Sequence, residues 1–199
     1  GGRYAYDFAI ANRSGLYWYH THAHELTAEQ AYAGLAGLLV VEDDDERKLR
    51  QALDLTLGVT DIPLLLQDKR FDADGRLVYG PMPPERMMGY LGDVMLVNLT
   101  PNPLLEIGNR LYRFRLLNGS NARIYRLAFV RNGKSLPFTV VGTDGGLLDA
   151  PRGEREAFLA PGERLDVLFD ASDLRKNDEV FLKSLAFDAM EGGGMGGMM

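Results

Sequence analysis

Hydrophobic residues recur along most of this chain in short runs or at every second position, the pattern of β-strands. Beyond residue 52 these runs are separated by turn pairs such as Asn118-Gly119 and Pro161-Gly162. The expected strands are 54–58, 64–68, 93–99, 105–118, 124–129, 138–143, 155–159, 164–169 and 180–185. Many short strands with little helix predict an all-β fold, a Greek-key sandwich.

The first 42 residues show a related pattern with one helix. The sequence predicts strands over 3–11, 16–20 and 38–42, and a helix that begins at Thr27 and ends by Gly37. In residues 3–11 aromatic and aliphatic side chains alternate with small or polar ones, as in a half-buried strand. Thr27 is expected to cap the helix, with Gln30 reaching back as in a capping box.

A run of charged residues over 43–50 suggests a solvated joint between two units. We therefore expect the C-terminal part of one sandwich over 1–43, a linker over 44–51, a second complete sandwich over 52–187, and a connecting segment over 188–199. The last nine residues hold five glycines and three methionines, which are too few apolar groups for a packed core. Both ends of the sequence have the pattern of a piece of a longer protein.

The amino-acid composition of the chain argues against several classes of function. The formal net charge of −6 argues against a nucleic-acid partner, because phosphate binding relies on lysine and arginine. The chain has no cysteine, which excludes disulfides and thiolate metal sites. No apolar run approaches the roughly 20 residues that a membrane helix needs.

All three histidines lie within seven residues, at His20, His22 and His24. Positions two apart on a strand face the same side, so His20 and His22 would present their imidazoles together. Neutral imidazole binds copper, zinc or iron well. Structural histidines remain an alternative. So does the metal-dependent amidohydrolase barrel, in which an H-x-H pair like His22 and His24 ends the first strand, although strand after strand downstream argues against that barrel.

Many segments of the chain, in order, resemble one known family. The bacterial multicopper oxidases, above all the laccase-like and cuprous-oxidase branch, have similar sequences at the end of their first cupredoxin domain and through their second. The segments that carry this likeness are Trp-Tyr-His-Thr-His at 18–22, Thr-Ala-Glu-Gln at 27–30, and 34–43, 61–63, 67–71, 74–75, 92–93, 98–99, 113–123, 143–148, 161–164 and 166–168.

The resemblance implies a cupredoxin-like Greek-key β-sandwich and a copper enzyme. In such enzymes a type 1 copper takes electrons from phenols or Cu(I), and a trinuclear copper cluster reduces dioxygen to water. His20 and His22 match the motif positions that bind one copper each of the type 3 pair. His24 matches a histidine that is not a metal ligand. We expect His24 and Trp18 to lie beside the ligands, although Trp18 also suits the core of the first sandwich.

The chain also departs from the family. It holds one of the histidine motifs and, without cysteine, no type 1 site. By itself it is expected to be inactive, with the remaining cupredoxin domains supplying the other ligands. The resemblance implies a periplasmic or secreted protein. The alternative is a non-catalytic cupredoxin-like scaffold of the cell envelope, like the division-associated relatives that kept the fold and lost the copper. Histidine at both positions favours the oxidase.

Two further groups of residues have open roles. Met190, Met195, Met198 and Met199 offer thioethers that suit Cu(I), while a glycine-rich segment equally suits a plain connector. The second group is expected to form structural ion pairs. It comprises Arg113, Arg115, Arg123, Arg126, Asp144 and Glu163.

Overall fold

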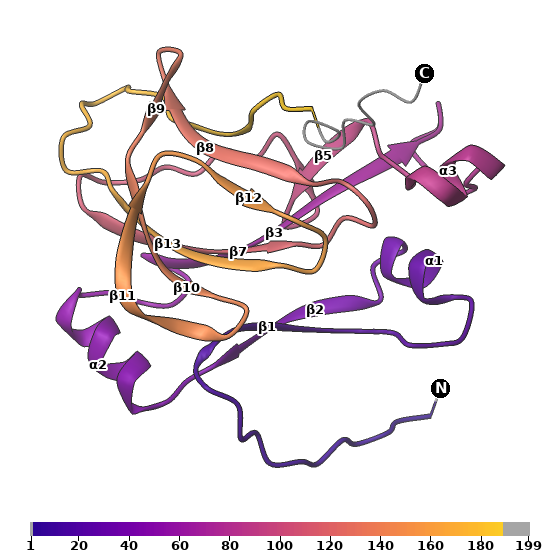
Figure 1. Cartoon of the computed structure of the whole chain (residues 1–199), viewed down its shortest axis with the longest axis horizontal. Coiled ribbons are helices and arrows are strands. Elements are labelled where there is room, and N and C mark those ends of the chain that lie inside the picture. Colours follow the sequence, from indigo (N-terminus) through magenta and orange to yellow (C-terminus); the bar gives the residue numbers. More distant parts are fainter. Residues whose placement is uncertain (1, 189–199) are drawn as a thin grey trace, which may run out of the picture.

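The structure is a computed structural model, and it describes residues 2–188. Strands dominate it, with three short helices (Figure 1). The elements are β1 (Gly15–His20), α1 (Thr27–Tyr32), β2 (Ala36–Val41), α2 (Asp44–Ala52), β3 (Asp61–Phe71), β4 (Leu77–Val78), α3 (Pro83–Met88), β5 (Val94–Val97), β6 (Thr100–Pro101), β7 (Leu111–Asn118), β8 (Tyr125–Arg131), β9 (Lys134–Leu136), β10 (Phe138–Thr143), β11 (Gly146–Glu154), β12 (Ala157–Leu159), β13 (Arg164–Asp170) and β14 (Phe181–Ser184).

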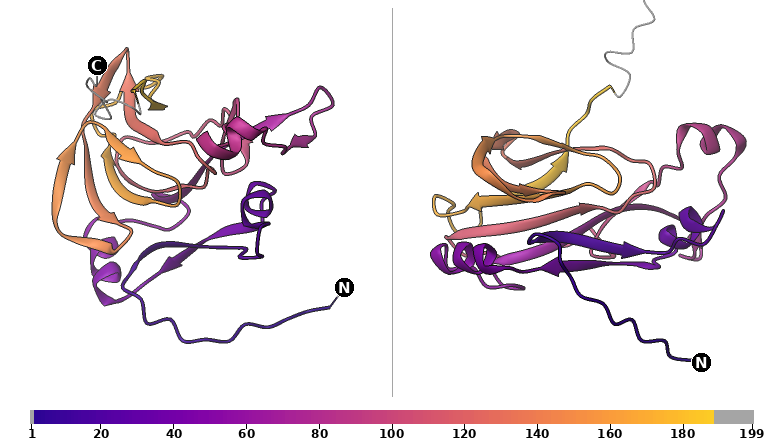
Figure 2. Two further views of the ribbon diagram at one scale, coloured as in Figure 1. Left: turned by 45° about the vertical axis from the view of Figure 1, so that its right-hand side comes forward. Right: turned by 60° about the horizontal axis from the view of Figure 1, so that its bottom comes forward.

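The strands form three sheets. The largest has the order β11-β10-β13-β7-β3-β5-β6, with β4 paired to β3. The second has the order β12-β8-β14, with β9 paired to β8, and it packs on the first (Figures 1 and 2). β1 and β2 form a separate antiparallel hairpin. β3 and β7 run parallel, and the other paired strands run antiparallel. The expectation of an all-β sandwich is confirmed.

The core of the sandwich follows from alternation along its strands. On β7 the side chains of Tyr112, Phe114 and Leu116 point between the two sheets and are at most 6% exposed. Phe129 of β8 meets them from the other sheet, and its ring stacks 4.5 Å from that of Phe169. Burial of these large apolar groups supplies the main driving force for this part of the fold.

The opposite face of β7 carries a buried ionic cluster. Arg113 and Arg115 are fully buried and contact the carboxylates of Glu46, Asp61 and Asp166. The expectation that both arginines form ion pairs is confirmed, with partners other than Asp144 and Glu163. Asp144 pairs with Arg164 instead, and the Glu163 carboxylate accepts a hydrogen bond from the Ala160 amide. Of the other two arginines, Arg123 pairs with Asp68 and Arg126 with Glu156.

The charged run after β2 forms a helix, α2, where the sequence suggested a solvated joint. Asp43 caps α2, since its Oδ1 accepts from the Glu46 amide at 2.9 Å and its Oδ2 from the Ser14 amide at 3.1 Å. These backbone hydrogen bonds, led by that from Glu46, lower the pKa of Asp43. Most charges of α2 face solvent, but Glu46 is fully buried beneath it against the two arginines. That contact is long-range, so the local charge pattern did not predict it.

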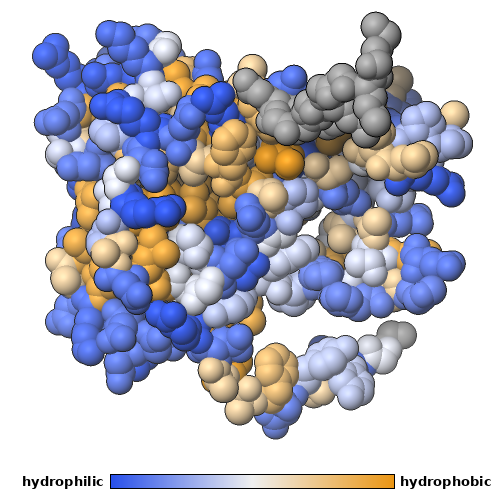
Figure 3. Space-filling model, in the orientation of Figure 1, coloured by the Kyte–Doolittle hydropathy of each residue, from blue (hydrophilic) through white to orange (hydrophobic). Residues whose placement is uncertain are grey.

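The N-terminal segment is not a strand, contrary to the alternating pattern of residues 3–11. Tyr4 and Tyr6 are 80% and 82% exposed, and Phe8 is 69% exposed. The segment stands away from the sandwich (Figures 2 and 3). A strand needs a neighbour for its backbone hydrogen bonds, and no described strand pairs with this segment.

Smaller differences arise where local signals compete. Residues 54–58 form turns with one isolated bridge instead of a strand. Helix α1 begins at Thr27, but no side chain caps it, and the Thr27 hydroxyl donates to the Ala23 carbonyl. The predicted capping box is therefore wrong, because the Gln30 side chain is engaged by Thr21. None of the described helices is long and apolar enough to cross a membrane.

Candidate metal centre

The hairpin β1–β2 presents two of the three histidines side by side. His20 is the last residue of β1, opposite Ala36, and His22 follows two residues later in the loop that leads to α1. The ring centroids of His20 and His22 are 4.4 Å apart, with 35° between the planes. The ring of Trp18 also stacks on that of His20, with 4.2 Å between their centroids. The two imidazoles lie together, as the sequence predicted, although His22 is in the loop beyond β1 and not on the strand itself.

The hydrogen bond of His20 determines which of its two ring nitrogens is available to bind a metal. Its Nδ1 lies 2.9 Å from the Thr21 carbonyl oxygen. A carbonyl oxygen only accepts, so Nδ1 carries the proton and donates it. The lone pair is then on Nε2. Metal-binding histidines usually donate their other ring nitrogen to a carbonyl or carboxylate in this way, so His20 fits the donor set of a copper site.

The pair is an incomplete site within the described part of the chain. No group of three or more histidine, cysteine, aspartate or glutamate side chains suited to a metal occurs between residues 2 and 188. His24 is not drawn to the pair; its side chain is 95% exposed, with Nδ1 3.8 Å from a carboxylate oxygen of Glu25. The predicted Cu(I) ligands Met190, Met195, Met198 and Met199 lie outside the described residues.

His20 also lines a cavity of about 340 Å³ between the hairpin and the sandwich. Trp18 and Ala31 line it from the hairpin side, and Leu65 and Gln67 from β3. The wall is mostly apolar. His20 therefore borders a space between the hairpin and the sandwich.

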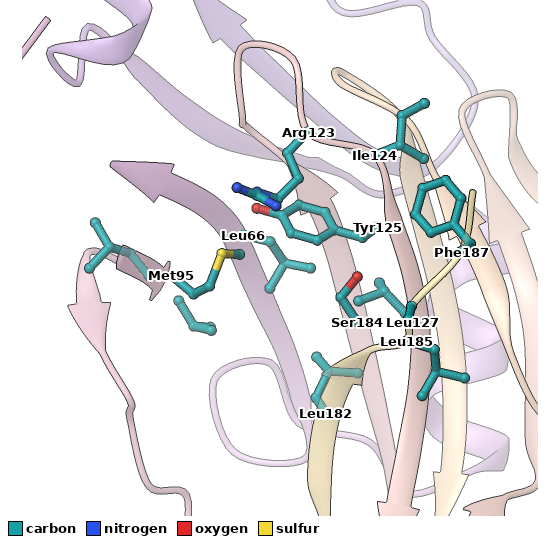
Figure 4. Close-up of a pocket in the computed structure, with 13 residues that line it drawn as sticks. Leu66, Met95, Arg123, Ile124, Tyr125, Leu127, Leu182, Ser184, Leu185 and Phe187 are labelled. Carbon is teal, nitrogen blue, oxygen red and sulfur yellow. The ribbon is translucent and has the colours of Figure 1, made fainter. Parts of the chain in front are cut away.

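A larger cavity of about 570 Å³ opens between β5 and β14 (Figure 4). Leu66, Met95 and Leu182 form part of its apolar wall, and Arg123 and the Tyr125 hydroxyl lie together at one end (Figure 4). Among the described residues, no histidine, cysteine, aspartate or glutamate lines it. Its donor set does not suit a copper ion, so the histidine pair is the better candidate site.

Tyr32, the last residue of α1, joins the histidine hairpin to the sandwich. It is 2% exposed, and its hydroxyl accepts from the Arg70 amide at 2.6 Å. Its ring contacts those of Tyr79 and Tyr90 at 4.9 Å and 5.4 Å. Burial raises the pKa of Tyr32 above its usual value. No pattern in the sequence indicates this role, because an isolated tyrosine in a short helix has no characteristic signature.

Lys69 of β3 also contacts Tyr32. Its ammonium donates to the Tyr32 carbonyl and lies 4.3 Å from the centroid of the Tyr32 ring. Lys69 is only 4% exposed, and burial lowers its pKa to about 8, with Asp68 opposing the change. The ammonium satisfies a carbonyl at the C-terminal end of α1, where a positive charge is favourable.

The lowered pKa of Lys69 predicts a pH dependence of stability. Between about pH 8 and 10 the unfolded chain keeps a proton that the folded chain has released, so the free energy of unfolding rises with pH. Relative to Lys69→Met, the wild-type chain should gain up to about 1.4 kcal/mol per pH unit in that window. Urea unfolding of both proteins at pH 7, 8, 9 and 9.5 measures this difference. A constant difference across the series would contradict the buried-ammonium account.

The chain is similar to known proteins in both sequence and structure. A family model of multicopper oxidases matches residues 1–46, which include the histidine pair. McoA, a multicopper oxidase from Aquifex aeolicus, superposes with a TM-score of 0.85 and 54% identity, covering 88% of this chain and 38% of McoA. The chain belongs to the multicopper oxidase family. The expected cupredoxin-like sandwich is thereby confirmed.

Two kinds of relative are similar to this chain in sequence. The laccase of Bacillus subtilis is 36% identical over 177 residues, which cover 84% of this chain and 33% of the laccase. The cell division protein FtsP of Xenorhabdus nematophila is 46% identical over 155 residues, which cover 78% of this chain and 31% of FtsP. The chain thus spans about a third of the length of these relatives.

Proposed function

We propose that this chain is part of a copper-dependent oxidase that couples one-electron oxidation of phenols or of Cu(I) to the four-electron reduction of dioxygen to water. The observation that carries the proposal is the pair of adjacent imidazoles, with His20 Nδ1 engaged and Nε2 left to a ligand. His20 and His22 would each hold one copper of the type 3 pair. Copper, when bound, supplies the electron transfer to dioxygen.

The chain's own contribution is to hold and orient these two ligands. Trp18 packs against His20, Thr21 fixes its ring through Nδ1, and Tyr32 holds the hairpin on the sandwich. Two imidazoles leave any copper under-liganded, so the remaining ligands would come from the other cupredoxin domains of the protein. We therefore expect the isolated chain to bind copper weakly and not to oxidise substrates.

The same reasoning assigns the parts of the chain. Residues 1–43 would complete a first cupredoxin domain, 44–51 would connect it to the second domain at 52–187, and 188–199 would lead onward. The exposed aromatic residues of the N-terminal segment support this assignment, because their alternation suits one side of a strand whose neighbours would belong to the rest of the first domain. The family also suggests a periplasmic or secreted location.

A scaffold role is the second candidate, and the similarity to the cell division protein FtsP favours it. A non-catalytic envelope protein needs the sandwich but no metal ligands. The paired histidines distinguish the two functions, since a scaffold does not require two imidazoles in contact with one free to bind a metal. The described sandwich does not have the alternating strands and helices of the amidohydrolase barrel.

Copper titration of the chain, followed by isothermal calorimetry, tests the proposal. Residues 1–188 of this sequence should bind copper, and His20→Ala and His22→Ala should each weaken the affinity by at least about tenfold. The truncation removes the methionines beyond residue 188, and His24→Ala is the matched control that should leave the affinity unchanged. Equal affinity in all four proteins, or no binding by any of them, would refute the copper site.

A further inference from the structure

Thr21 holds the acceptor that fixes the His20 ring, and several hydrogen bonds hold Thr21 in turn. The Thr21 amide donates to the Leu35 carbonyl at 3.2 Å. The Thr21 hydroxyl donates to Oε1 of Gln30 and also accepts weakly, at 3.4 Å, from the Ala23 amide. The peptide that carries the Thr21 carbonyl is therefore restrained on both sides.

Gln30 of α1 contributes to two of these restraints. Its side-chain oxygen accepts a hydrogen bond from the Thr21 hydroxyl, and its main-chain carbonyl accepts one from the Leu35 amide at 2.9 Å. Leu35 in turn accepts from the Thr21 amide. Gln30 thus holds the loop after β1 in place through hydrogen bonds of both its side chain and its main chain.

Helix α1 is itself fixed to the sandwich. Asn121 donates from Nδ2 to the Ala28 carbonyl at 2.9 Å, and Tyr32 is buried against β3. A short helix is marginal in isolation and depends on such tertiary contacts. The position of Gln30 is consequently set by the second part of the molecule, far along the sequence from the histidines.

We propose that Gln30 is a positioning residue for the metal ligand His20, acting through Thr21. It keeps the Thr21 carbonyl facing His20 Nδ1, so that the imidazole stays in the Nδ1–H form with Nε2 available to a metal. The role of these contacts in metal binding rests on the proposed copper function, but the Nδ1–H form of His20 does not itself require copper.

Nitrogen-15 NMR of the metal-free chain, with labelled histidine, tests the proposal directly. Long-range proton–nitrogen spectra at a pH where the imidazoles are neutral show which ring nitrogen carries the proton. In the wild-type chain His20 should be mainly Nδ1–H. In Gln30→Ala the Nδ1–H form should lose its majority, because the Thr21 peptide is no longer held.

Two variants of the same helix separate positioning from general damage. Gln30→Glu retains a side-chain acceptor for the Thr21 hydroxyl and should restore the Nδ1–H form. Glu29→Ala removes the neighbouring exposed side chain and should leave the tautomer unchanged. If Gln30→Ala fails to fold by circular dichroism, Thr21→Val decides the question, since it deletes the hydroxyl without altering α1.

The proposal is overturned if His20 is mainly Nε2–H in the wild-type chain, or if the tautomer is the same in the wild-type chain and in a folded Gln30→Ala or Thr21→Val variant. Copper titration of the same proteins adds a second readout, with an expected loss of about tenfold in affinity for Gln30→Ala. A tautomer that depends on Gln30 in a chain that binds no copper would refute the proposed function alone. Copper binding with an unchanged tautomer would refute the positioning role alone.

Discussion

Replacing Arg115 with methionine is expected to lower the free energy of unfolding by about 3–5 kcal/mol, because it leaves buried carboxylates without their partner. Arg115 is fully buried. Its Nη2 lies 2.5 Å from Glu46 Oε1 and 2.6 Å from Asp61 Oδ2, and its Nε donates to Asp61 Oδ1 at 2.7 Å. Burial opposes the charge of Arg115, but Asp61, Asp166 and Glu46 outweigh it and raise its pKa.

The cluster already has more carboxylates than guanidinium groups, which makes the loss of one arginine severe. Burial raises the pKa of Asp166 even with both arginines present. Urea denaturation at pH 7 measures the effect, with Arg76→Met as the matched control. Arg76 pairs with Asp74 on the surface, where both side chains are at least 69% exposed, so its loss should cost less than about 1 kcal/mol. Equal losses in the two variants would show that the buried cluster contributes nothing particular to stability.

Replacing Tyr32 with alanine is expected to cost about 3–5 kcal/mol, the range for deleting a large buried aromatic side chain. The change removes the contacts with Tyr79 and Tyr90, the cation–π contact with Lys69 and the hydrogen bond to the Arg70 amide. These contacts hold α1, so the hairpin that carries the histidines should loosen before the sandwich does.

Hydrogen exchange with residue resolution distinguishes this local effect from global unfolding. Amides of β1 and β2 should exchange faster in Tyr32→Ala, while those of β7 and β13 should change less. Tyr4→Ala is the control, since Tyr4 is 80% exposed, and it should alter stability by no more than about 0.5 kcal/mol. Uniform acceleration across all strands would contradict the role of Tyr32 as the joint of the hairpin.

Many strands of the sandwich were predictable because their own sequences carry the strand pattern, although β11 was not predicted. β10 has the predicted bounds, 138–143, and β13 differs from prediction by one residue at its end. The turn pairs between strands are local signals of the same kind. The two largest errors of prediction concern residues whose structure depends on distant partners. The segment 3–11 has a strand pattern but no neighbour, and Glu46 has the pattern of a solvated charge but lies against Arg113 and Arg115.

The proximity of the two histidines was predictable from their spacing, since alternate positions on a strand share a face, although His22 lies in the loop just beyond the end of β1. The residues that orient the pair were not. The sequence pattern places Thr21 in the histidine motif and Gln30 in a capping box, and neither pattern shows that the Thr21 hydroxyl donates to the Gln30 side chain. Tyr32 and Lys69 meet only because α1 folds back onto β3. Contacts that join the hairpin to the sandwich are tertiary, and no local pattern encodes them.

The central claim is that His20 and His22 together form a copper-binding pair. Crystals of the chain grown with copper, measured above and below the copper absorption edge, test it most directly, because anomalous scattering locates the metal. The account predicts anomalous peaks at the pair, with copper bound to an imidazole nitrogen of each residue and with Nε2 as the ligand atom of His20. Copper located only at His24 and Glu25, or elsewhere on the surface with none at the pair, would contradict it.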